Sequence, residues 1–568
     1  MEKNSDEKNN NLDTNDNKNA QINGDQDNGH ELPDTIQHFI KIIESRIARS
    51  GEMRTKMGRM TEDDSFFYEA VMRLSTYIRS AEDKNKQSAD MKQSSPTEMI
   101  LQRAATFMEE ELRVLLEESG HNDDGATEGE DAYEPFSPEV VTRMNRIATV
   151  MISGGYETEC CQVYSICRHN AFLKDMRRLG YEKIESDDIE KMSWDSLEGE
   201  ITRWVRVVKS CYEVLFIGER RLAEAVFSEH PLISRGLFRN LARAMVIRLL
   251  DFVEMIARTK CSAEQLFKFL DMYETIHGLI PAISDGCLVD SEHEITSEIL
   301  VAGDRIGEAC VKIFCDLENS IKNDVARNPV PGGAVHPLTR YVMNYLINAC
   351  DFRPTLERIF QKHANSTGKC ETSSFSAQLL NTMDLLDKNL EAKSNLYKDL
   401  SLRVIFLMNN GRYILQKIKG SPEIHEAMGD TSYRRRSTVV RQYHKNYQRE
   451  TWGKVLQILK HDGLLQNGKV NKAALKERFK SFSNMMDEIH KTQSTWVVND
   501  EQLQSELRVS ISAVIIPAYR AFLAKFKQHL DGSKHVDRYI KYQSDDIETL
   551  IEGLFDGNPT SMNKSRKN

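Results

Sequence analysis

The amino-acid sequence predicts an all-α protein built of stacked antiparallel helical bundles. Its 568 residues exceed the roughly 250–300 at which one hydrophobic core stops growing, so the chain must divide into domains or extend as packed helical layers. The 13 prolines are clustered, and residues 139–230 and 423–516 contain none. Such long stretches without a helix breaker favour helices over a loop-rich β fold. We therefore expect mostly helix and little or no sheet.

Composition narrows the class of protein further. The formal charge of −10, from 76 basic and 86 acidic residues, argues against a general nucleic-acid binder, so we expect no nucleic-acid partner. The 10 cysteines form no CxxC pair and no Cys/His spacing typical of zinc, which predicts no metal site and thiols kept in a reducing compartment. No secretory signal or long apolar run is evident, so we expect a cytoplasmic chain with peripheral membrane contact at most.

The N-terminal part is predicted to contain a tail and an assembly region. Residues 1–32 are rich in asparagine and lack aromatic residues, which predicts a disordered tail. Residues 33–116 are predicted as an N-terminal helical region, with helices over 36–47, 66–78 and 99–116. The first helix carries isoleucines at the four-three-four spacing of a coiled-coil seam. The seam either packs within the chain or binds a partner subunit, and its members are Ile36, Ile40, Ile43 and Ile47.

An acidic linker over residues 117–136 is predicted to lead into the first half of the helical body, residues 137–328. Ser137 and Pro138 begin that half as a hydroxyl cap followed by a first-turn proline, and Ser262 with Gln265 forms a capping box further on. Apolar residues recur every three or four positions, and short links between the helices predict antiparallel neighbours.

Residues 329–337 are predicted to be an elbow between two helices, because three prolines and two glycines cannot continue a helix. The elbow is either a fixed corner or a hinge. Residues 338–556 form the second half of the body, and residues 557–568 a second disordered tail. Within the second half, residues 376–408 carry one continuous apolar stripe, which predicts a single long helix and favours a rod over a globule.

No motif predicts catalysis. The sequence lacks a GxSxG, HExxH, Walker or GxGxxG pattern, so we expect no enzyme, no catalytic residue and no cofactor. His336, between the prolines of the elbow, is the one histidine in a notable setting. We interpret it as a polar group bonded to the loop backbone rather than as a general base.

Two basic clusters are candidate binding sites. Residues 431–454 mix arginines with Tyr443, Tyr447 and Trp452, a pattern that can bind single-stranded nucleic acid. Because these aromatic residues also have helical spacing, we expect them to pack inward while the arginines face solvent or pair with acidic neighbours. The second group, here called the C-terminal basic cluster, consists of Arg520, Lys525, Lys527, Lys534, Arg538 and Lys541.

Four segments resemble the plant branch of the seventy-kilodalton exocyst subunits. The longest is residues 328–345, NPVPGGAVHPLTRYVMNY. The others are residues 155–164, GYETECCQVY, residues 218–222, GERRL, and residues 516–522, IPAYRAF. With weaker matches between them, the resemblance covers residues 66–555.

The resemblance implies an elongated all-helical rod that serves as an exocyst subunit and tethers secretory vesicles to the plasma membrane before fusion. It implies that the seam binds other exocyst subunits. It also implies that the C-terminal basic cluster binds phosphatidylinositol bisphosphate at the inner face of the plasma membrane. Small GTPases are further candidate partners. The alternative is a diverged cytosolic regulator on the same helical rod, which binds proteins but neither the membrane nor the full exocyst.

Overall fold

The structure is a computed structural model that describes residues 33–49, 62–85, 96–117, 136–260, 262–284, 292–367, 374–466, 469–530 and 539–557. The predicted tail 1–32, almost all of the predicted linker and almost all of the predicted tail 557–568 lie outside these residues. The chain divides into two compact units. Unit 1 comprises Met1–Ala171 and Gly218–Phe238, and unit 2 comprises Phe172–Ile217 and Arg239–Asn568. The division does not fall at the elbow, which lies inside unit 2.

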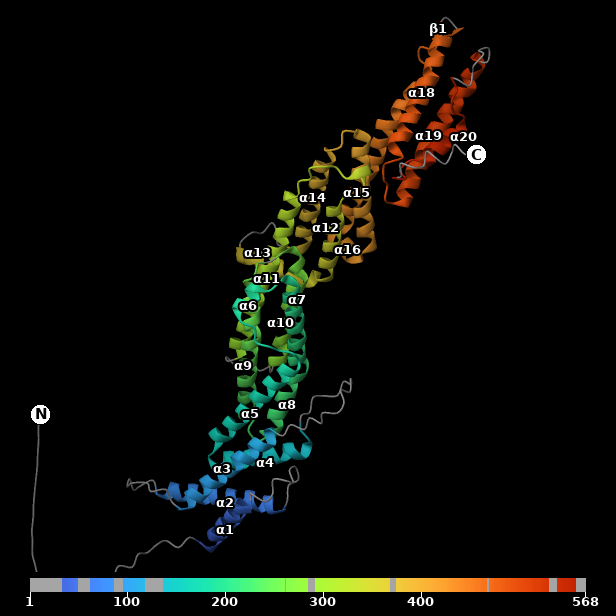
Figure 1. Ribbon diagram of the computed structural model, residues 1–568. Helices are drawn as coiled ribbons and strands as arrows, with labels where there is room; N and C mark the ends of the chain where they lie inside the picture. The colour runs from blue at the N-terminus through green and yellow to red at the C-terminus, as the bar shows by residue number, and fades with distance from the viewer. Residues whose placement is uncertain are drawn as a thin grey trace, which may run out of the picture. The chain divides into compact units, whose positions relative to one another are not determined.

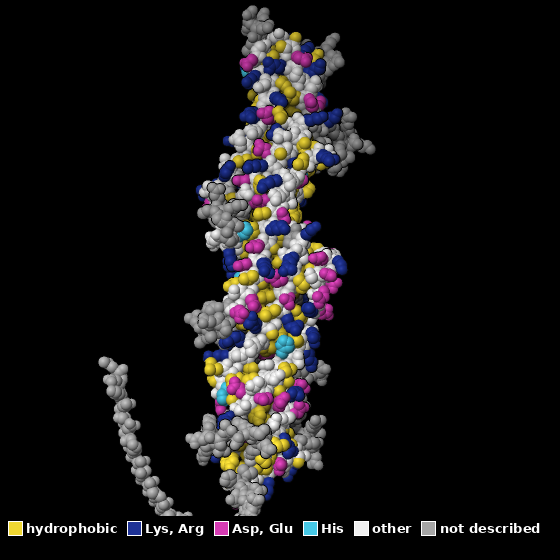
Figure 2. Space-filling model, turned by 90° about the vertical axis from the view of Figure 1, so that its left-hand side faces the viewer, with side chains coloured by type: hydrophobic (Ala, Val, Ile, Leu, Met, Phe, Trp, Pro, Cys, Tyr) yellow, Lys and Arg dark blue, Asp and Glu magenta, His cyan; other side chains and the backbone are white. Residues whose placement is uncertain are grey.

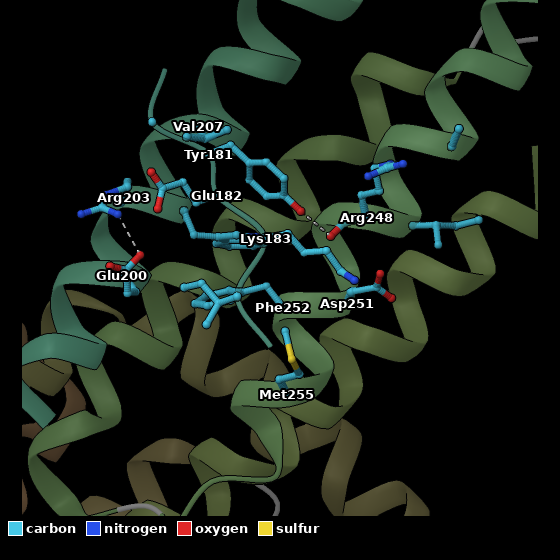
Figure 3. A pocket seen from close by; sticks show the side chains of 15 residues that line it. Tyr181, Glu182, Lys183, Glu200, Arg203, Val207, Arg248, Asp251, Phe252 and Met255 are labelled. Carbon is cyan, nitrogen blue, oxygen red and sulfur yellow. Dashed lines mark hydrogen bonds and ion pairs between the residues drawn. The ribbon is translucent and has the colours of Figure 1, made fainter. Parts of the chain in front are cut away.

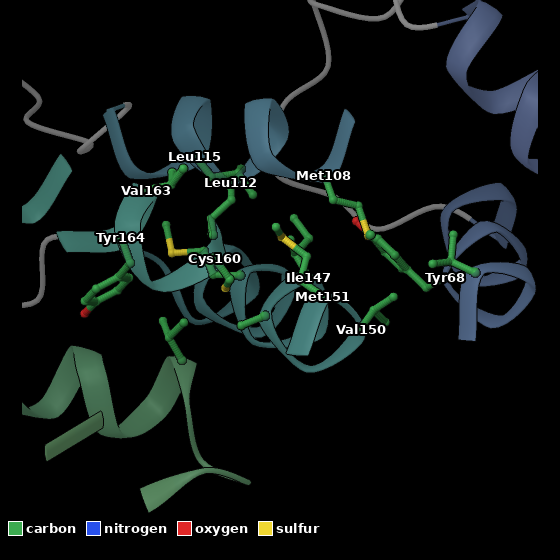
Figure 4. Close-up of a cluster of buried hydrophobic side chains, with 14 of the residues drawn as sticks. Tyr68, Met108, Leu112, Leu115, Ile147, Val150, Met151, Cys160, Val163 and Tyr164 are labelled. Atoms are coloured by element: carbon green, nitrogen blue, oxygen red, sulfur yellow. The ribbon is translucent and has the colours of Figure 1, made fainter. Parts of the chain in front are cut away.

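Unit 1 is a bundle of helices around one apolar core. Three helices contribute to both units: α5 (Glu157–Arg178), α8 (Phe216–Val226) and α9 (Pro231–Ala257). The helices that belong wholly to unit 1 are α1 (Asp34–Ala48), α2 (Glu62–Asn85), α3 (Pro96–Glu117) and α4 (Pro138–Gly154). Figure 4 shows how side chains of three helices converge in this core. They are Met108, Leu112 and Leu115 of α3, Ile147, Val150 and Met151 of α4, and Cys160, Val163 and Tyr164 of α5.

Unit 2, taken by itself, is an elongated stack of antiparallel helices (Figure 1). Its first helices are α6 (Ser186–Lys191), α7 (Trp194–Ser210), α10 (Leu266–Ile283), α11 (Glu292–Asn323), α12 (Pro337–Asp351) and α13 (Arg353–Thr367). The later ones are α14 (Phe375–Ser394), α15 (Leu400–Gly420), α16 (Pro422–Tyr447), α17 (Gly453–Ile458), α18 (Lys472–Gln493), α19 (Glu501–Phe526) and α20 (Ser544–Glu552). Two-residue strands β1 (Leu465–Gln466) and β2 (Lys469–Val470) pair antiparallel.

The predicted helix starts are confirmed where the sequence carries a cap. The Ser137 hydroxyl accepts a hydrogen bond from the Val140 N–H, with Pro138 in the first turn of α4, and Ser262 and Gln265 form their capping box. The all-α class is also confirmed, because among the described residues the only sheet is the pair of two-residue strands.

The prediction of one helix over residues 376–408 is wrong. Helix α14 ends at Ser394, and α15 begins at Leu400 with Asp399 as its cap, whose carboxylate accepts from the N–H of Ser401 at 2.7 Å. The apolar spacing is unbroken across the gap because Tyr397, inside the connection, is itself buried. Periodicity alone therefore could not reveal the break.

The elbow is a fixed corner of unit 2. Gly332 and Gly333 adopt positive φ angles of 65° and 73°, which favour glycine because a side chain would clash there. The Tyr397 hydroxyl donates to the Val330 carbonyl at 2.8 Å, and the buried Asn409 amide donates to the Gly333 carbonyl at 2.7 Å. Side chains from α14 through α15 thus satisfy the carbonyl groups that the irregular backbone leaves free.

Candidate functional site at the C-terminal basic cluster

Four of the six residues of the C-terminal basic cluster lie among the described residues. Arg520 and Lys525 are on α19, Lys527 follows at the end of the same helix, and Lys541 precedes α20. The other two, Lys534 and Arg538, lie outside the described residues.

The sequence of α19 determines on which side of the helix each of its three cations lies. Tyr519, Phe522 and Phe526 are buried in the core of unit 2, and the Tyr519 ring stacks on that of Phe482 at 4.5 Å. Arg520, Lys525 and Lys527 are exposed between them. At 100° per residue, Arg520 and Lys527 share one side of the helix, whereas Lys525 is turned away by about 140°. The three cations therefore do not form one compact binding pocket.

Lys541 is held by an acidic partner. Its ammonium group pairs with the Asp487 carboxylate of α18 and lies 4.9 Å from the centre of the Tyr542 ring. The Tyr542 hydroxyl also donates to Asp487, and the Tyr519 hydroxyl donates to the Tyr542 carbonyl at 2.6 Å. Although partial burial opposes both shifts, this bonding raises the pKa of Lys541 and lowers that of Asp487. Lys541 is therefore a partly neutralised cation.

The sequence analysis missed Asp487. This residue lies 54 positions before Lys541, and no local spacing connects the two. Only the packing of α18 beside the segment that leads into α20 brings them together. The face drawn in Figure 2 is mixed in charge as well, with Lys and Arg side chains interspersed with Asp and Glu.

In the basic and aromatic cluster at residues 431–454, aromatic side chains pack inward, as we expected from their helical spacing. Tyr447 and Trp452 are buried, and the Trp452 indole N–H donates to the Tyr447 hydroxyl at 3.2 Å. Arg436 pairs with Asp384 at 3.3 Å and also with Asp387. The aromatic rings that a single strand of nucleic acid would need for stacking are thus occupied by the core.

The isoleucine seam of α1 packs within unit 1. Ile36 and Ile43 are buried, with exposed fractions of 7% and 0%, and Ile40 and Ile47 are partly buried against the same core. Helices α2 and α3 cover this side of α1. Of the two alternatives that the sequence left open, the structure shows the first: the seam packs within the chain, which supplies its own apolar partners. Binding of another subunit through α1 stays a prediction, and it would have to use the opposite side of the helix.

His336 bonds to the main chain, as we interpreted from the sequence, and the structure shows that it does so as the cap of α12. Its Nδ1 atom accepts a hydrogen bond from the Leu338 N–H at 3.0 Å at the start of α12. Burial lowers the pKa of His336 and nearby Lys393 lowers it further. Both effects favour the neutral imidazole that can accept this bond. No group of three or more potential metal ligands occurs among the described residues.

Helix α19 is long and apolar enough to cross a membrane by length and composition, the one such helix among the described residues. Its apolar side chains have a different use in the structure. Leu503, Leu507, Ile511 and Ile515 are buried in the core of unit 2. Val509 and Val514 of the same helix are exposed, so packing accounts for one side of α19.

The fold defines an all-α protein of stacked antiparallel helical bundles, with binding surfaces rather than a catalytic centre as its candidate sites. The family model that describes the C-terminal part of the Exo70 subunits of the exocyst complex matches residues 202–553. The chain belongs to the Exo70 family of exocyst subunits, and members of this family are structural subunits rather than enzymes.

Individual relatives agree with this assignment. The Exocyst complex component EXO70C1 of Arabidopsis thaliana is 45% identical, covering 94% of this chain and 89% of that protein. EXO70C2 of the same plant is 44% identical, covering 94% of this chain and 83% of that protein. The crystal structure of Exo70p from S. cerevisiae matches with a TM-score of 0.57 at 13% identity, covering 92% of this chain and 99% of that one. At this identity the likeness concerns the fold alone.

Proposed function

We propose that this chain works with the other exocyst subunits to tether secretory vesicles to the plasma membrane before fusion. It acts from the cytoplasm and contacts the inner face of the plasma membrane peripherally. Its C-terminal basic cluster binds anionic phosphoinositide headgroups, and α1 contributes to binding of other subunits. The proposal rests on family membership together with one observation: Arg520, Lys525 and Lys527 are exposed at the end of α19.

The electrostatics support a weak contact. Within the described part of unit 2, Arg520, Lys525 and Lys527 have no acidic partner within ion-pairing distance. At roughly 1 kcal/mol for each cation near an anionic leaflet, three such cations contribute about 3 kcal/mol. Even a weak dissociation constant of about 1 mM requires a binding free energy of roughly 4 kcal/mol. Stable recruitment therefore needs a second attachment, which the other subunits of a complex provide by avidity.

One observation favours a second candidate function. Because Asp487 neutralises Lys541, and because the α19 cations are spread around the helix, the cluster is poorer in free charge than its sequence suggests. A diverged cytosolic regulator that binds proteins, but neither the membrane nor the full exocyst, would tolerate this smaller positive charge. Co-purification of the full-length chain with exocyst subunits from plant cells separates the two functions. The tethering function requires the subunits to be recovered in stoichiometric amounts.

Flotation with liposomes tests the membrane contact directly. We expect the wild-type chain to float with vesicles that contain phosphatidylinositol bisphosphate at low salt and to be released at high salt, where exposed charges are screened. The variants R520A/K525A/K527A and K534A/R538A should each float less. A control that removes three exposed cations elsewhere in unit 2, R258A/K260A/K312A, should float like wild type. Equal flotation of all four proteins would overturn the membrane assignment.

A further inference from the structure

The cavity that Figure 3 shows in unit 2 offers little surface to a ligand. It lies between α7, α9 and the connection from α5 to α6, and its volume is about 390 Å³. The rings of Trp204 and Phe252 stack with their centres 5.9 Å apart, and these residues are only 4% and 6% exposed. Lys183 of the lining pairs with Glu185 at 3.2 Å. Exposed apolar side chains of unit 2 lie instead on α19.

One side of α19 exposes apolar side chains to solvent. The opposite side packs on the core, where Leu507, Ile511 and Ile515 are buried. Val509 and Val514, in contrast, are 65% and 46% exposed. At about 100° per residue, the exposed apolar residues lie within roughly 140° of one another around the helix. They form the α19 strip, which consists of Val509, Ala513, Val514, Pro517 and Ala521.

A row of cations lies along the exposed side of α16. Its members are Arg434, Arg441, Lys445 and Arg449, the last of which is in the helical turn Gln448–Trp452 that continues α16. At about 100° per residue they fall within roughly 80° of one another. With a rise of about 1.5 Å per residue, the row is about 22 Å long. We call this row the α16 stripe.

The α16 stripe lacks compensating negative charge. Arg441 donates to two neutral oxygen atoms one turn earlier in α16, both at 3.4 Å. In the part of the chain that the structure describes, no carboxylate is within ion-pairing distance of Arg434, Arg441 or Lys445. Arg449 pairs with its neighbour Glu450 at 3.5 Å. A ligand that brings carboxylates to this row would therefore form charge-assisted hydrogen bonds.

The α16 stripe and the α19 strip lie side by side. His444 of α16 shares a hydrogen bond of 3.0 Å with the hydroxyl of Ser510 on α19, and the turn that continues α16 also contacts α19. Arg441 and Lys445 lie on either side of His444 along α16, and Val509 directly precedes Ser510 along α19. One ligand can therefore contact both the cations and the apolar side chains.

The chemistry of this surface favours a protein helix over a lipid bilayer as its ligand. Helices that enter a bilayer interface bury Trp, Phe or Leu side chains, and the α19 strip contains none. Its small residues Ala513 and Ala521 instead allow the axis of a second helix to approach closely. Arg441, Lys445 and Arg449 recur every four residues, so they match acidic side chains at the same spacing along one edge of such a helix.

We propose that the α19 strip and the α16 stripe together bind an amphipathic helix of a partner protein. The apolar side of this helix packs on the α19 strip. Acidic residues three or four positions apart along one edge of the helix pair with the α16 stripe. The surface uses no residue of the C-terminal basic cluster, so it adds a protein contact to the proposed membrane contact and does not depend on it.

Two synthetic helical peptides test the proposal. Both are hydrocarbon-stapled and carry leucines on one side, and along one edge the first has glutamate at every fourth position where the second has lysine. The fluorescein-labelled glutamate peptide should bind the purified full-length chain in a fluorescence anisotropy titration. The lysine peptide should bind at least about tenfold more weakly, since it presents like charges to the α16 stripe.

Charge reversal tests whether the peptide contacts the α16 stripe. R441E/K445E should weaken binding of the glutamate peptide by about tenfold or more and should strengthen binding of the lysine peptide. The matched control is K472E/K480E, which reverses two exposed cations of α18. Because the control has the same net charge, it should leave both affinities unchanged if the contact is specific.

A second pair of variants tests the α19 strip. Val514→Asp places a charge beneath the apolar side of the bound helix and should weaken binding by about tenfold or more. Val301→Asp on α11 is the matched control, because Val301 is 47% exposed and Val514 is 46% exposed. A thermal melt accompanies each variant. If Val514→Asp loses its native melting temperature, Val509→Asp replaces it, since Val509 is more exposed.

The outcomes that overturn the proposal are distinct. They are equal binding of the two peptides, binding by R441E/K445E as tight as by its control, and unchanged affinity in the folded valine variant. A membrane surface would give another result: neither peptide binds, and R441E/K445E no longer floats with vesicles that contain phosphatidylinositol bisphosphate while K472E/K480E does. That result would also overturn the proposal.

Discussion

The main-chain N–H of Val497 donates a hydrogen bond of 2.8 Å to the carbonyl oxygen of Gly332. This bond joins the elbow to the connection between α18 and α19, 165 residues further along the chain. A Cβ atom on Gly332 would lie 2.9 Å from a methyl carbon of Val497 and 3.2 Å from the Thr495 carbonyl. The close approach, together with the positive φ of Gly332, leaves no room for a side chain.

Gly332→Ala should therefore destabilise unit 2. We expect a loss of about 1–3 kcal/mol, which is the usual magnitude for a residue held in a sparsely populated backbone region. Urea unfolding followed by far-ultraviolet circular dichroism should show a lower midpoint. Gly199→Ala is the matched control, because Gly199 is inside α7 and has open space around its Cβ position. That substitution should stabilise the chain slightly, and a smaller effect of Gly332→Ala than of the control would contradict the prediction.

A buried ion pair in unit 1 supports a second prediction. Arg168 and Glu219, with exposed fractions of 1% and 3%, join α5 to α8 through a bidentate contact. Glu219→Gln removes one charge and leaves the other buried, which costs about 3–5 kcal/mol. We expect a clear drop in melting temperature and faster limited proteolysis of unit 1.

The control for this ion pair is an exposed one. Arg73 and Glu69 of α2 are more than half exposed, so Glu69→Gln should change stability by no more than about 0.5 kcal/mol. Equal effects of Glu69→Gln and Glu219→Gln would show that the burial of Arg168 does not determine how much stability Glu219→Gln removes.

Helix positions were predictable because they depend on local signals. Apolar spacing and the caps at Ser137 and Ser262 identified the helices, and the prolines and glycines of residues 329–337 identified the elbow. The break before Leu400 was not predictable, because Tyr397 continues the apolar spacing through a non-helical turn. Tertiary bonds to residues distant in the sequence, such as those of Val497 and Asn409, made the elbow a fixed corner, and no local pattern could show this.

The candidate site was predicted less completely than the fold. The charge of Arg520, Lys525 and Lys527 was evident from the sequence, and the structure adds that they lie along α19 and at its end. That Asp487 neutralises Lys541 was not evident, because ion pairing between distant segments depends on packing. The cavity between α7, α9 and the connection from α5 to α6 carried no motif either, because its lining comes from three segments that lie apart in the sequence.

The burial of the isoleucine seam gives a third prediction. Ile43 is fully buried between α1 and the rest of unit 1, so Ile43→Asp should unfold the N-terminal helices by placing a charge in the core. Circular dichroism should show a loss of helix and a lower melting temperature. Lys41→Ala, on the exposed side of α1, should leave both unchanged. If Ile43→Asp kept the wild-type helix content and melting temperature, the seam would not be part of the core.

His336 predicts a pH dependence of stability. Burial lowers its pKa below the ordinary value of 6.5, so the unfolded chain binds a proton at a higher pH than the folded chain does. The neutral imidazole of His336 therefore makes its full contribution to the free energy of unfolding above about pH 6.5. This contribution is lost as the pH falls toward the pKa of the folded chain. His336→Asn keeps a side chain that can cap α12 but does not titrate. We expect this variant to match wild type at pH 8 and to lose less stability between pH 7 and pH 5 in urea unfolding. Parallel pH profiles of the two proteins would exclude a contribution from His336.

The pairing of Lys541 with Asp487 makes the membrane contact testable by a gain of function. If the C-terminal basic cluster binds anionic headgroups, Asp487→Asn should strengthen binding to vesicles that contain phosphatidylinositol bisphosphate, because it frees the charge of Lys541. The gain should be at most about 1 kcal/mol, the contribution of one cation near an anionic leaflet. Lys541→Ala should reduce flotation by a similar amount, since it leaves the negative charge of Asp487 uncompensated, and K525A/K527A should reduce it further. A thermal melt must show that Asp487→Asn is folded, because Asp487 also accepts a bond from Tyr542. If folded Asp487→Asn floats no better than wild type, the ion pair does not limit the charge available to the membrane.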